Sequence, residues 1–293
     1  MQINIGLCIN DSYSQHSGVL MASILSQASE EDSYKFYIVT DYISEDNRAK
    51  FEQLKSIKDF ELEYIEVKNE DYENIRGGKH LHISQFYRLA LLKLEAVDKL
   101  LYLDSDTICL HDIRELYETD IENYAMAGAE DIMGRRMKQK YCLHPMATYV
   151  NSGVLLLNLK ETRKVDIFAI LNNLPETFVA GDFGDQDIIN HVFQDKILPV
   201  DIKWNYSYPF ATTYFDVEYY QSIQNNPYII HWITDIKPWK PNVRVAHKYE
   251  EYFKYLKLTP WNNKDFYIDY LIRGNTEIMS NIRTLLEHFN IPY

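Results

Sequence analysis

The segment Lys99-Leu-Leu-Tyr-Leu-Asp104-Ser-Asp106 constrains the fold of this chain more than any other stretch. Its apolar, β-prone run ends abruptly in two aspartates separated by one residue, which predicts a buried strand that delivers two carboxylates to the C-terminal edge of a sheet. Open α/β folds bind their ligands at that edge. Two hard oxygen donors there suit Mg²⁺ or Mn²⁺ carrying a diphosphate, because these ions take few protein carboxylates and share substrate phosphates. A solvated turn at the strand end is the alternative.

The composition is that of an acidic globular protein. With 293 residues, the chain is long enough for one large α/β domain or two small ones. The net charge of -13 argues against nucleic acid or anionic lipid as a general partner, because both bind basic surfaces. A phosphorylated ligand would need local neutralisation in such a protein, which a divalent cation provides directly.

The N-terminal residues and the cysteines both favour a cytoplasmic protein. The first residues, Met-Gln-Ile-Asn-Ile-Gly-Leu-Cys, lack the basic region of a signal peptide, and no apolar run is long enough for a membrane-spanning helix. The three cysteines, Cys8, Cys109 and Cys142, cannot all pair and lack metal-type spacing. We therefore expect buried or idle thiols in a reducing compartment.

Strand-like and helix-like segments alternate through the first hundred residues. Strands are expected over 3–9, 35–40, 61–67 and 99–103, and helices over 16–28, 44–57 and 84–96. This alternation predicts an α/β fold with a mainly parallel sheet and helices on both faces. The first strand runs into Cys8-Ile-Asn10-Asp11-Ser-Tyr13 without a G-x-G-x-x-G pattern, which argues against a dinucleotide fingerprint and against a P-loop.

The chain changes character after about residue 243. The remainder is rich in Tyr, Phe, Lys and Asn and has a helical pattern over 276–288. We expect residues 1–243 to form the main domain and residues 244–293 to form a helical C-terminal extension. Capping of the core is the favoured role of this extension, and docking on a membrane or on a partner is the alternative.

Two polar clusters interrupt apolar segments in the second half of the chain. A core strand over 149–158 carries Asn151-Ser-Gly153, where Gly153 lets the backbone approach a ligand and Asn151 offers a donor and an acceptor. A β-bulge with a polar edge explains this pattern equally well. The stretch Gly181-Asp182-Phe-Gly184-Asp185-Gln186-Asp187 opens an apolar helical run, although acids in a first helical turn are also ordinary caps.

Two basic side chains complete the candidate site. Lys237, held by the following proline, comes six residues after His231, which ends a β-branched strand. This pair can supply a third metal ligand and a phosphate partner. Arg88 lies on the predicted helix that leads to the aspartate strand, where its fork suits a phosphate or a carboxylate. A salt bridge to a core acid is the alternative for Arg88.

In this order the clusters resemble glycosyltransferase family 8, the retaining transferases that include bacterial lipopolysaccharide galactosyl- and glucosyltransferases and glycogenin. The resemblance is collinear over about residues 2–240. It rests on Asn10 and Tyr13, Arg88-Leu89, Leu-Tyr-Leu-Asp104-Ser-Asp106, Glu130-Asp131, Asn151-Ser-Gly153, Asp185-Gln186-Asp187, His231 and Lys237-Pro238-Trp239. It implies a GT-A fold, which is Rossmann-like with a mixed, mainly parallel sheet, and a UDP-sugar donor bound through Mn²⁺ or Mg²⁺.

The resemblance also implies roles for individual residues. The metal ligands would be Asp104, Asp106 and His231. The uridine of the donor would contact Cys8, Asn10 and Tyr13. Its diphosphate would contact Lys237, with Ser105 beside the metal. The residues around its sugar would be Arg88, Asp131, Asn151, Asp185 and Gln186. Among these, Asp131, Asp185 and Gln186 are the catalytic candidates. One position departs from the family, because Thr234 stands where a glycine usually lets the backbone near the phosphate; its hydroxyl can serve instead.

The implied function is retaining, metal-dependent transfer of a hexose from a UDP-sugar to a saccharide, glycoprotein or glycolipid acceptor, such as a bacterial surface glycan. Galactose is favoured over glucose. A non-catalytic UDP-sugar- or carbohydrate-binding protein is one alternative. A nucleotidyltransferase is another, although it would want a Gly-rich, basic loop after the first strand. We expect a cytoplasmic protein that binds no nucleic acid, with peripheral contact with the inner face of the membrane through the extension left open.

Overall fold

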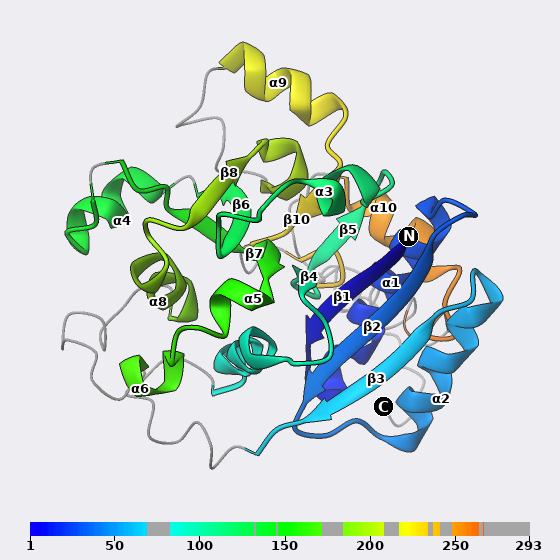
Figure 1. The fold of residues 1–293 in the computed structure, drawn as a ribbon. Coiled ribbons are helices and arrows are strands. Elements are labelled where there is room, and N and C mark those ends of the chain that lie inside the picture. Colours follow the sequence, from blue (N-terminus) through cyan, green and yellow to red (C-terminus); the bar gives the residue numbers. More distant parts are fainter. Residues whose placement is uncertain are drawn as a thin grey trace, which may run out of the picture.

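The computed structural model describes residues 1–68, 83–131, 133–144, 146–171, 184–207, 217–233, 237–240, 248–263 and 266. Its strands are β1 (Gln2–Cys8), β2 (Ser33–Thr40), β3 (Glu61–Glu66), β4 (Lys99–Leu103), β5 (Thr107–Cys109), β6 (Met126–Glu130), β7 (Val150–Asn158), β8 (Ile197–Val200), β9 (Tyr206–Ser207) and β10 (Ile229–His231). Seven of these form a twisted sheet in the order β3-β2-β1-β4-β7-β6-β8, and the other three form a small sheet in the order β5-β10-β9 (Figure 1).

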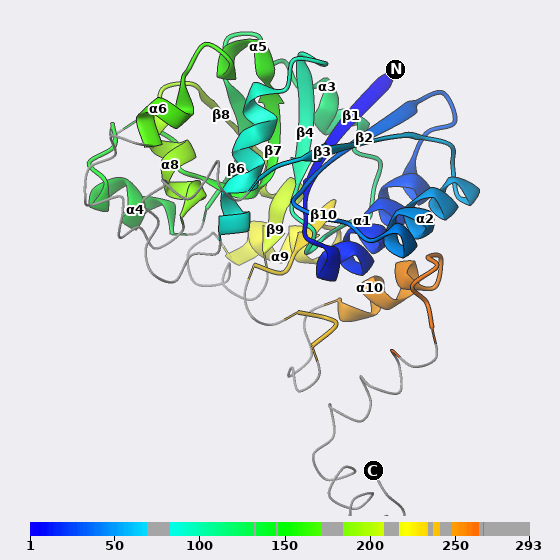
Figure 2. The ribbon, with the colours of Figure 1, turned by 90° about the horizontal axis from the view of Figure 1, so that it is seen from below.

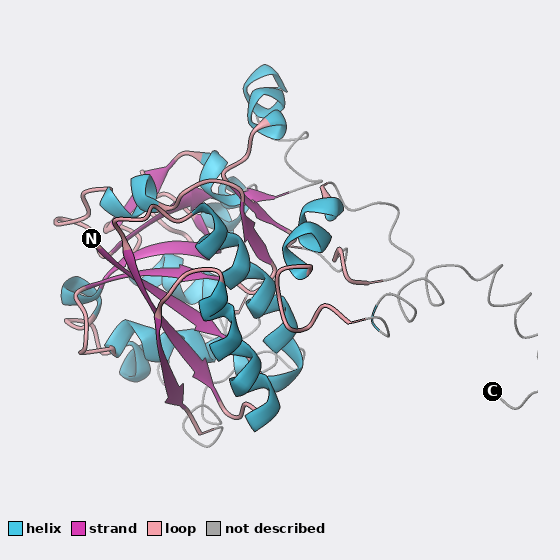
Figure 3. Cartoon of the chain, turned by 90° about the vertical axis from the view of Figure 1, so that its right-hand side faces the viewer, coloured by secondary structure: helices cyan, strands magenta, loops and turns pink. Residues whose placement is uncertain are grey.

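Helices cover both faces of the large sheet (Figure 3). The α-helices are α1 (Ser14–Gln27), α2 (Glu45–Gln53), α3 (Arg114–Glu118), α4 (Gly134–Lys140), α5 (Leu159–Thr162), α6 (Ile167–Leu171), α8 (Asp185–Val192), α9 (Val217–Asn225) and α10 (Tyr249–Leu256). The 3₁₀ helices are η1 (Asp11–Tyr13), η2 (Leu54–Ser56), η4 (Ile83–Lys93) and η5 (Ile202–Asn205). One apolar core joins the sheet to α1, α2, α3 and α10, and a second core joins its other face to η4, α5, α6 and α8.

The pairing of the strands confirms the predicted mainly parallel α/β sheet. Parallel ladders join β3 to β2, β2 to β1, β1 to β4 and β6 to β8, whereas β7 is antiparallel to both of its neighbours. The sequence predicted β1, β2, β3 and β4 to within two residues at each end. β1 and β4 are central and buried; β4 is apolar from Leu100 onward, and β1 also buries Asn4, whose side chain donates to Tyr117 Oη.

The predicted helices differ more in detail. The helix expected over 44–57 is divided between α2 and η2, with Ser44 as the N-cap that accepts a hydrogen bond from the Asn47 backbone N–H. The helix expected over 84–96 is a 3₁₀ helix that ends at Lys93. This tighter segment lies directly on β1, where a Cβ added to Gly6 would come within 2.8 Å of Leu91. The helical pattern over 276–288 falls outside the described residues.

An irregularity in β7 sets up the site. Gly128 of β6 pairs with Leu155, but Glu130, only two residues further on, pairs with Val150. The segment Asn151–Gly153 therefore leaves the ladder with β6, so the sequence-based alternative of a bulge with a polar edge describes the backbone correctly. Asn190 of α8 holds the residue just before this segment, because its side-chain amide bonds both the N–H and the C=O of Val150 at 2.7 and 2.8 Å.

Residues 248–263 pack on the apolar core that contains α1. α10 lies against α1 (Figure 2), and Tyr252, Tyr255, Leu256 and Trp261 belong to the same apolar cluster as the buried face of α1. Within the described residues, no helix combines the length and the apolar character needed to cross a bilayer.

Candidate metal centre and donor site

The register of the small sheet brings two distant segments of the chain together. β5 begins one residue after Asp106 and pairs antiparallel with β10, so that Thr107 lies opposite His231. The Trp232 N–H donates to the Asp106 backbone carbonyl at 3.1 Å and extends this contact past the strand end. Residues separated by 125 positions in the sequence thus share one edge, next to the C-terminal end of β4.

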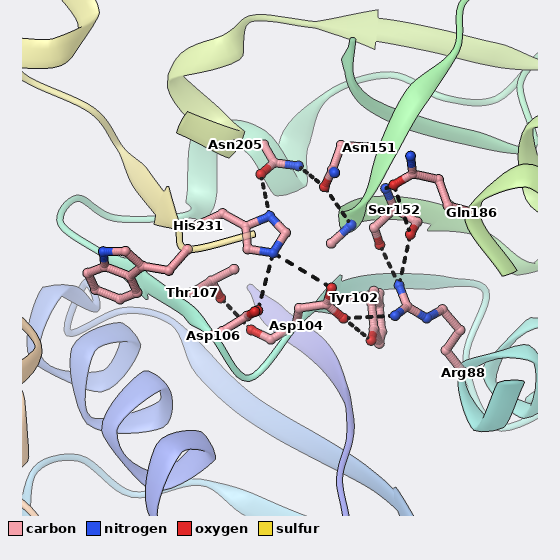
Figure 4. A network of polar contacts seen from close by, with 12 residues as sticks. Arg88, Tyr102, Asp104, Asp106, Thr107, Asn151, Ser152, Gln186, Asn205 and His231 are labelled. Atoms are coloured by element: carbon pink, nitrogen blue, oxygen red, sulfur yellow. Dashed lines mark hydrogen bonds and ion pairs between the residues drawn. The ribbon is translucent and has the colours of Figure 1, made fainter. Parts of the chain in front are cut away.

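Asp104, Asp106 and His231 form a group that can hold a metal ion, with ligand atoms all within 4.8 Å of one another. The His231 Nε2 atom lies 3.2 Å from Asp106 Oδ1 and 3.8 Å from Asp104 Oδ2 (Figure 4). His231 is 3% exposed, whereas the two carboxylates are half-buried. The sequence predicted this trio as metal ligands, and the structure places the three side chains together.

A chain of hydrogen bonds determines which nitrogen of His231 carries the proton. The backbone N–H of Gly153 donates to Asn151 Oδ1 at 3.0 Å, and Asn205 Nδ2 donates to the same oxygen at 2.9 Å. Asn205 Oδ1 must therefore face His231 Nδ1, 2.9 Å away, and accept a hydrogen bond from the Nδ1–H group. A neutral His231 then presents a bare Nε2 lone pair to the two aspartates, which is the arrangement found in metal-binding histidines.

In each of the two aspartates, one carboxylate oxygen pairs with a basic side chain of the protein and the other faces His231 Nε2. Lys237 Nζ lies 2.5 Å from Asp106 Oδ2, and Arg88 lies 3.2 Å from Asp104 Oδ1. Asp106 Oδ1 is buried, has no hydrogen-bond donor among the described residues and faces the bare His231 Nε2. Two carboxylate oxygens and one imidazole nitrogen that point at each other repel without a cation, so these residues fit a divalent metal ion.

Burial raises the pKa of Asp106, but the charge of Lys237, together with that of His231 when the metal-free imidazole is protonated, holds this pKa well below its ordinary value. Asp106 is therefore ionised throughout the neutral range. Lys237 also donates to the Trp232 carbonyl and is 9% exposed, so the cation predicted for the diphosphate lies at the metal centre itself. Ser105, between the two aspartates, is buried, and its hydroxyl accepts a hydrogen bond from Ser17 of α1 at 2.8 Å.

Gly153 is required by the packing of the metal ligands. A Cβ at this position would lie 2.1 Å from His231 Cε1 and 2.9 Å from Asp104 Oδ2. The sequence predicted that the backbone of Gly153 approaches a ligand closely, and in the structure the close approach is to the His231 ring. An alanine here would displace the ring, because both contacts are with groups fixed by hydrogen bonds.

Arg88 connects the metal end of the site to the first turn of α8. Its guanidinium makes ion pairs with Asp104 at 3.2 Å and Asp185 at 2.5 Å and donates to the backbone O and Oγ of Ser152 at 3.0 Å each. Burial alone would lower the pKa of Arg88, but the two carboxylates raise it well above its ordinary value. The contact given as the alternative for Arg88, a salt bridge to a buried acid, is thus present in this structure.

The residues expected around the donor sugar form one network with β7 and α8. Gly184, with φ of 60° and ψ of -117°, turns the chain into α8 in a conformation that suits glycine. The Ser152 N–H donates to Gln186 Oε1 at 3.0 Å, and Gln186 Nε2 donates to Asp131 Oδ2 at 3.3 Å. Asn151 Nδ2 donates to the same Asp131 oxygen at 3.0 Å. Asp131 and Gln186 therefore share one buried cluster.

Asp185 and Asp187 have different environments although both begin α8. Burial raises the pKa of Asp185 to about 6, opposed by the charge of Arg88. Asp187 instead accepts hydrogen bonds from the hydroxyl of Tyr141, at 2.7 Å, and from that of Tyr149. The helix-cap explanation that the sequence left open for Asp187 is incomplete, because two tyrosine hydroxyls bind its carboxylate.

The residues expected at the uridine follow the C-terminal end of β1. Asn10 caps η1, and its Oδ1 accepts from the Tyr13 N–H at 3.2 Å and from Ser12 Oγ at 2.7 Å. Tyr13 is 39% exposed, and its ring makes an edge contact with Trp239. Cys8 is half-buried near Arg88, and burial raises the pKa of its thiol, so Cys8 is a neutral group here. Thr234 lies outside the described residues.

Sequence reasoning missed several residues that organise the site. Asn205, which orients His231, has no recognisable pattern around it. Tyr102 donates to Asp104 Oδ1, and the alternation of side chains along β4 would have placed both on one face. Ser152 and Asn190 were missed because their role follows from the break in the ladder of β7.

Known proteins resemble this chain over most of its length. The family model described as Glycosyl transferase family 8 matches residues 4–242. General stress protein A of Bacillus subtilis (strain 168) is 28% identical over 277 residues, which span 89% of this chain and 95% of that protein. The lipopolysaccharide 1,2-glucosyltransferase of Escherichia coli is 26% identical over 276 residues, which span 89% and 79% of the two chains.

A solved structure of the galactosyltransferase LgtC, in complex with donor and acceptor sugar analogs, superimposes with a TM-score of 0.77 at 24% identity. The alignment covers 91% of this chain and 99% of LgtC. This likeness confirms the predicted GT-A fold.

Proposed function

The chain belongs to glycosyltransferase family 8, and we propose that it transfers a hexose from a UDP-sugar to a hydroxyl of a saccharide, glycoprotein or glycolipid acceptor. We further propose that the reaction needs a divalent cation, Mn²⁺ or Mg²⁺, and retains the anomeric configuration. The observation that carries this proposal is the trio of Asp104, Asp106 and His231, with a bare His231 Nε2 facing an unpaired Asp106 oxygen at 3.2 Å.

The leaving group explains why such a trio is needed. Transfer breaks the bond between the anomeric carbon and the β-phosphate oxygen, so negative charge builds up on the diphosphate. A divalent ion bound by the trio would supply Lewis-acid stabilisation of that charge. Lys237, at 2.5 Å from Asp106, adds a positive charge at the same edge.

The sugar end of the site has the opposite requirement. The anomeric centre gains positive character as the bond breaks, and Asp131 and Asp185 are carboxylates that can orient sugar hydroxyls and stabilise that charge. Gln186, bonded to Asp131 and Ser152, is a poor nucleophile because an amide holds its lone pair in resonance. We therefore favour front-face attack by the acceptor oxygen, whose proton passes to the departing diphosphate, over a double displacement.

A donor panel tests this function without knowledge of the acceptor. Purified protein, freed of metal with EDTA, is incubated with UDP-galactose, UDP-glucose or UDP-N-acetylglucosamine, and UDP release is followed as MnCl₂ or MgCl₂ is added. We expect metal-dependent hydrolysis of a UDP-hexose. Full turnover in EDTA would contradict the metal assignment, and faster release from UDP-glucose would overturn the preference for galactose.

The same assay separates the alternative functions. A non-catalytic binding protein would bind UDP but release none from any donor. A nucleotidyltransferase would form pyrophosphate from UTP and a sugar phosphate. If hydrolysis occurs, NMR of the first-formed hexose, before mutarotation, reports whether the configuration is retained.

A further inference from the structure

The segment 248–263 contacts the donor site at two places, one at the turn after β1 and one beside Lys237. Both contacts involve residues that no catalytic role explains, Tyr252 and Trp261. The segment packs on α1 and belongs to the main core, as Figure 2 shows for α10. The question is whether it only covers apolar surface or also positions the residues that follow β1.

The first contact reaches η1 through Asn47. Trp261 Nε1 donates to Asn47 Oδ1 at 2.9 Å, and Asn47 Nδ2 donates to Asp11 Oδ1 at 2.8 Å. The Ser44 N–H donates to the same Asp11 oxygen at 2.8 Å. Asp11 is the first residue of η1, between Asn10 and Tyr13, so the indole of Trp261 is two hydrogen bonds away from the turn that carries both proposed uridine contacts.

The Trp261 ring has a dedicated site on α1. A Cβ added to Gly18 would lie 2.2 Å from the indole, so this glycine provides the space that the ring occupies. Phe51 of α2 makes an edge contact with the same ring, at 5.0 Å between centroids. The indole N–H is therefore held in a fixed direction toward Asn47, which is what a positioning contact requires.

The second contact reaches the metal end. Tyr252 Oη lies 2.7 Å from His16 Nδ1 and accepts a hydrogen bond from Gln15 Nε2 at 3.1 Å. The His16 ring stacks on Trp239, with centroids 3.7 Å apart and planes 18° apart. Trp239 is two residues from Lys237, whose ammonium pairs with Asp106, and Trp239 also faces Tyr13.

We propose that residues 248–263 brace the nucleoside end of the donor site, and that Trp261 and Tyr252 are positioning residues for the donor nucleotide. The proposal rests on the proposed function, because it takes Asn10, Tyr13 and Lys237 as contacts of UDP. It assigns to the C-terminal extension a role in donor affinity, in addition to covering the core.

The chain offers a matched pair of variants. Trp261→Phe keeps an aromatic side chain at this position and removes the N–H that bonds Asn47. Tyr255→Phe removes a hydroxyl of the same segment that accepts from Gln27, at the opposite end of α1 from η1. Each variant loses one hydrogen bond to the body of the protein, and the urea midpoint of each variant reports its loss of stability separately from its UDP affinity.

The readout is the dissociation constant of UDP in saturating MnCl₂, measured by calorimetry on the full chain. We expect Trp261→Phe to weaken UDP binding about fivefold, the loss of roughly one hydrogen bond. Tyr255→Phe should stay within about twofold of wild type, with a similar urea midpoint for both variants. Tyr252→Phe, which keeps the ring and removes the hydroxyl, should weaken UDP binding by a smaller factor of about three.

A double-mutant cycle tests the route of the effect. If Trp261 acts through Asn47, Trp261→Phe should cause no further loss of UDP affinity in an Asn47→Ala background. Full additivity, or equal UDP affinity in Trp261→Phe and wild type, would overturn the proposal. A wild-type protein that binds no UDP would contradict the proposed function instead, so the two failures are distinguishable.

Discussion

The metal end of the site (Asp104, Asp106 and His231) and its sugar end (Asp131 and Asp185) differ in how their charges are compensated. At the metal end, Asp106 Oδ1 and the bare Nε2 of His231 face each other at 3.2 Å with no donor between them. At the sugar end, Asp185 pairs with Arg88, and Asp131 accepts hydrogen bonds from Asn151, Gln186 and the Met133 N–H. The first arrangement depends on a cation from outside the chain, whereas the second is satisfied by the protein itself.

This difference teaches where each kind of perturbation should act. Substitution of a metal-ligating side chain, or removal of the metal, should lower activity through the metal end without unfolding the protein. A change of pH should affect the sugar end, because Asp185 has a pKa of about 6 whereas that of Asp106 is held far below the neutral range. Arg88 is the bridge, since it pairs with one acid at each end.

Loss of the Asp106 charge is the largest expected effect. Asp106→Asn should lower metal-dependent UDP release by roughly 1,000-fold, because a neutral amide is a weak ligand and leaves Lys237 without its counter-charge. Asp98→Asn is the matched control. Asp98 is a carboxylate at the opposite end of β4 that is 55% exposed and pairs with Lys160 and Arg163 at the surface. Equal loss in both variants would show that the effect does not arise at the metal centre.

Loss of the Asn205 amide is expected to act through His231. Asn205→Ala removes the acceptor that holds the Nδ1 proton, so we expect the Mn²⁺ concentration for half-maximal UDP release to rise about 10- to 100-fold. The rate at saturating Mn²⁺ should change much less. Asn226→Ala serves as control, because Asn226 bonds His111 at 2.8 Å in a second, exposed Asn–His pair. An unchanged metal requirement in Asn205→Ala would refute the tautomer assigned to His231.

The remaining expected effect is on the free energy of unfolding, and it arises at the sugar end. The folded-state pKa of Asp185 is about 6 against a reference of 3.8, so between these values the folded protein keeps a proton that the unfolded chain has released. Stability from this group is therefore highest below about pH 4 and falls as pH rises through 6, by about 3 kcal/mol in total. Urea unfolding of wild type and Asp185→Asn between pH 4.5 and 7.5 measures it. A wild-type-minus-variant difference that does not fall with pH would contradict the assignment.

The comparison also explains which parts of the site were predictable. Asp104, Asp106 and His231 stand at strand ends, where a local pattern of apolar residues followed by a polar one is visible in the sequence. Asn205 stands in a short 3₁₀ turn, η5, and acts only because β9 and β10 place it beside His231. Tyr149 and Tyr141 likewise reach Asp187 from segments whose own patterns show no link to α8.

The C-terminal segment shows the same limit. Its aromatic content favoured a role in covering the core, and α10 packs on α1, whereas the helical pattern predicted over 276–288 lies outside the described residues. Nothing in the local sequence around Trp261 indicates that its indole would bond Asn47, more than 200 residues earlier. The space beside Gly18 that admits the ring exists only when α1 and the segment 248–263 are assembled.

The sequence by itself determined the strands and helices of the first hundred residues, the mainly parallel sheet, and the two aspartates at the end of β4, because these depend on local periodicity and on abrupt changes from apolar to polar residues. The tertiary structure decided which side chains meet. The antiparallel register of β5 and β10, the break in β7 and the return of the chain over α1 result from packing between distant segments. That packing decides which nitrogen of His231 faces the aspartates and what holds the turn after β1 in place.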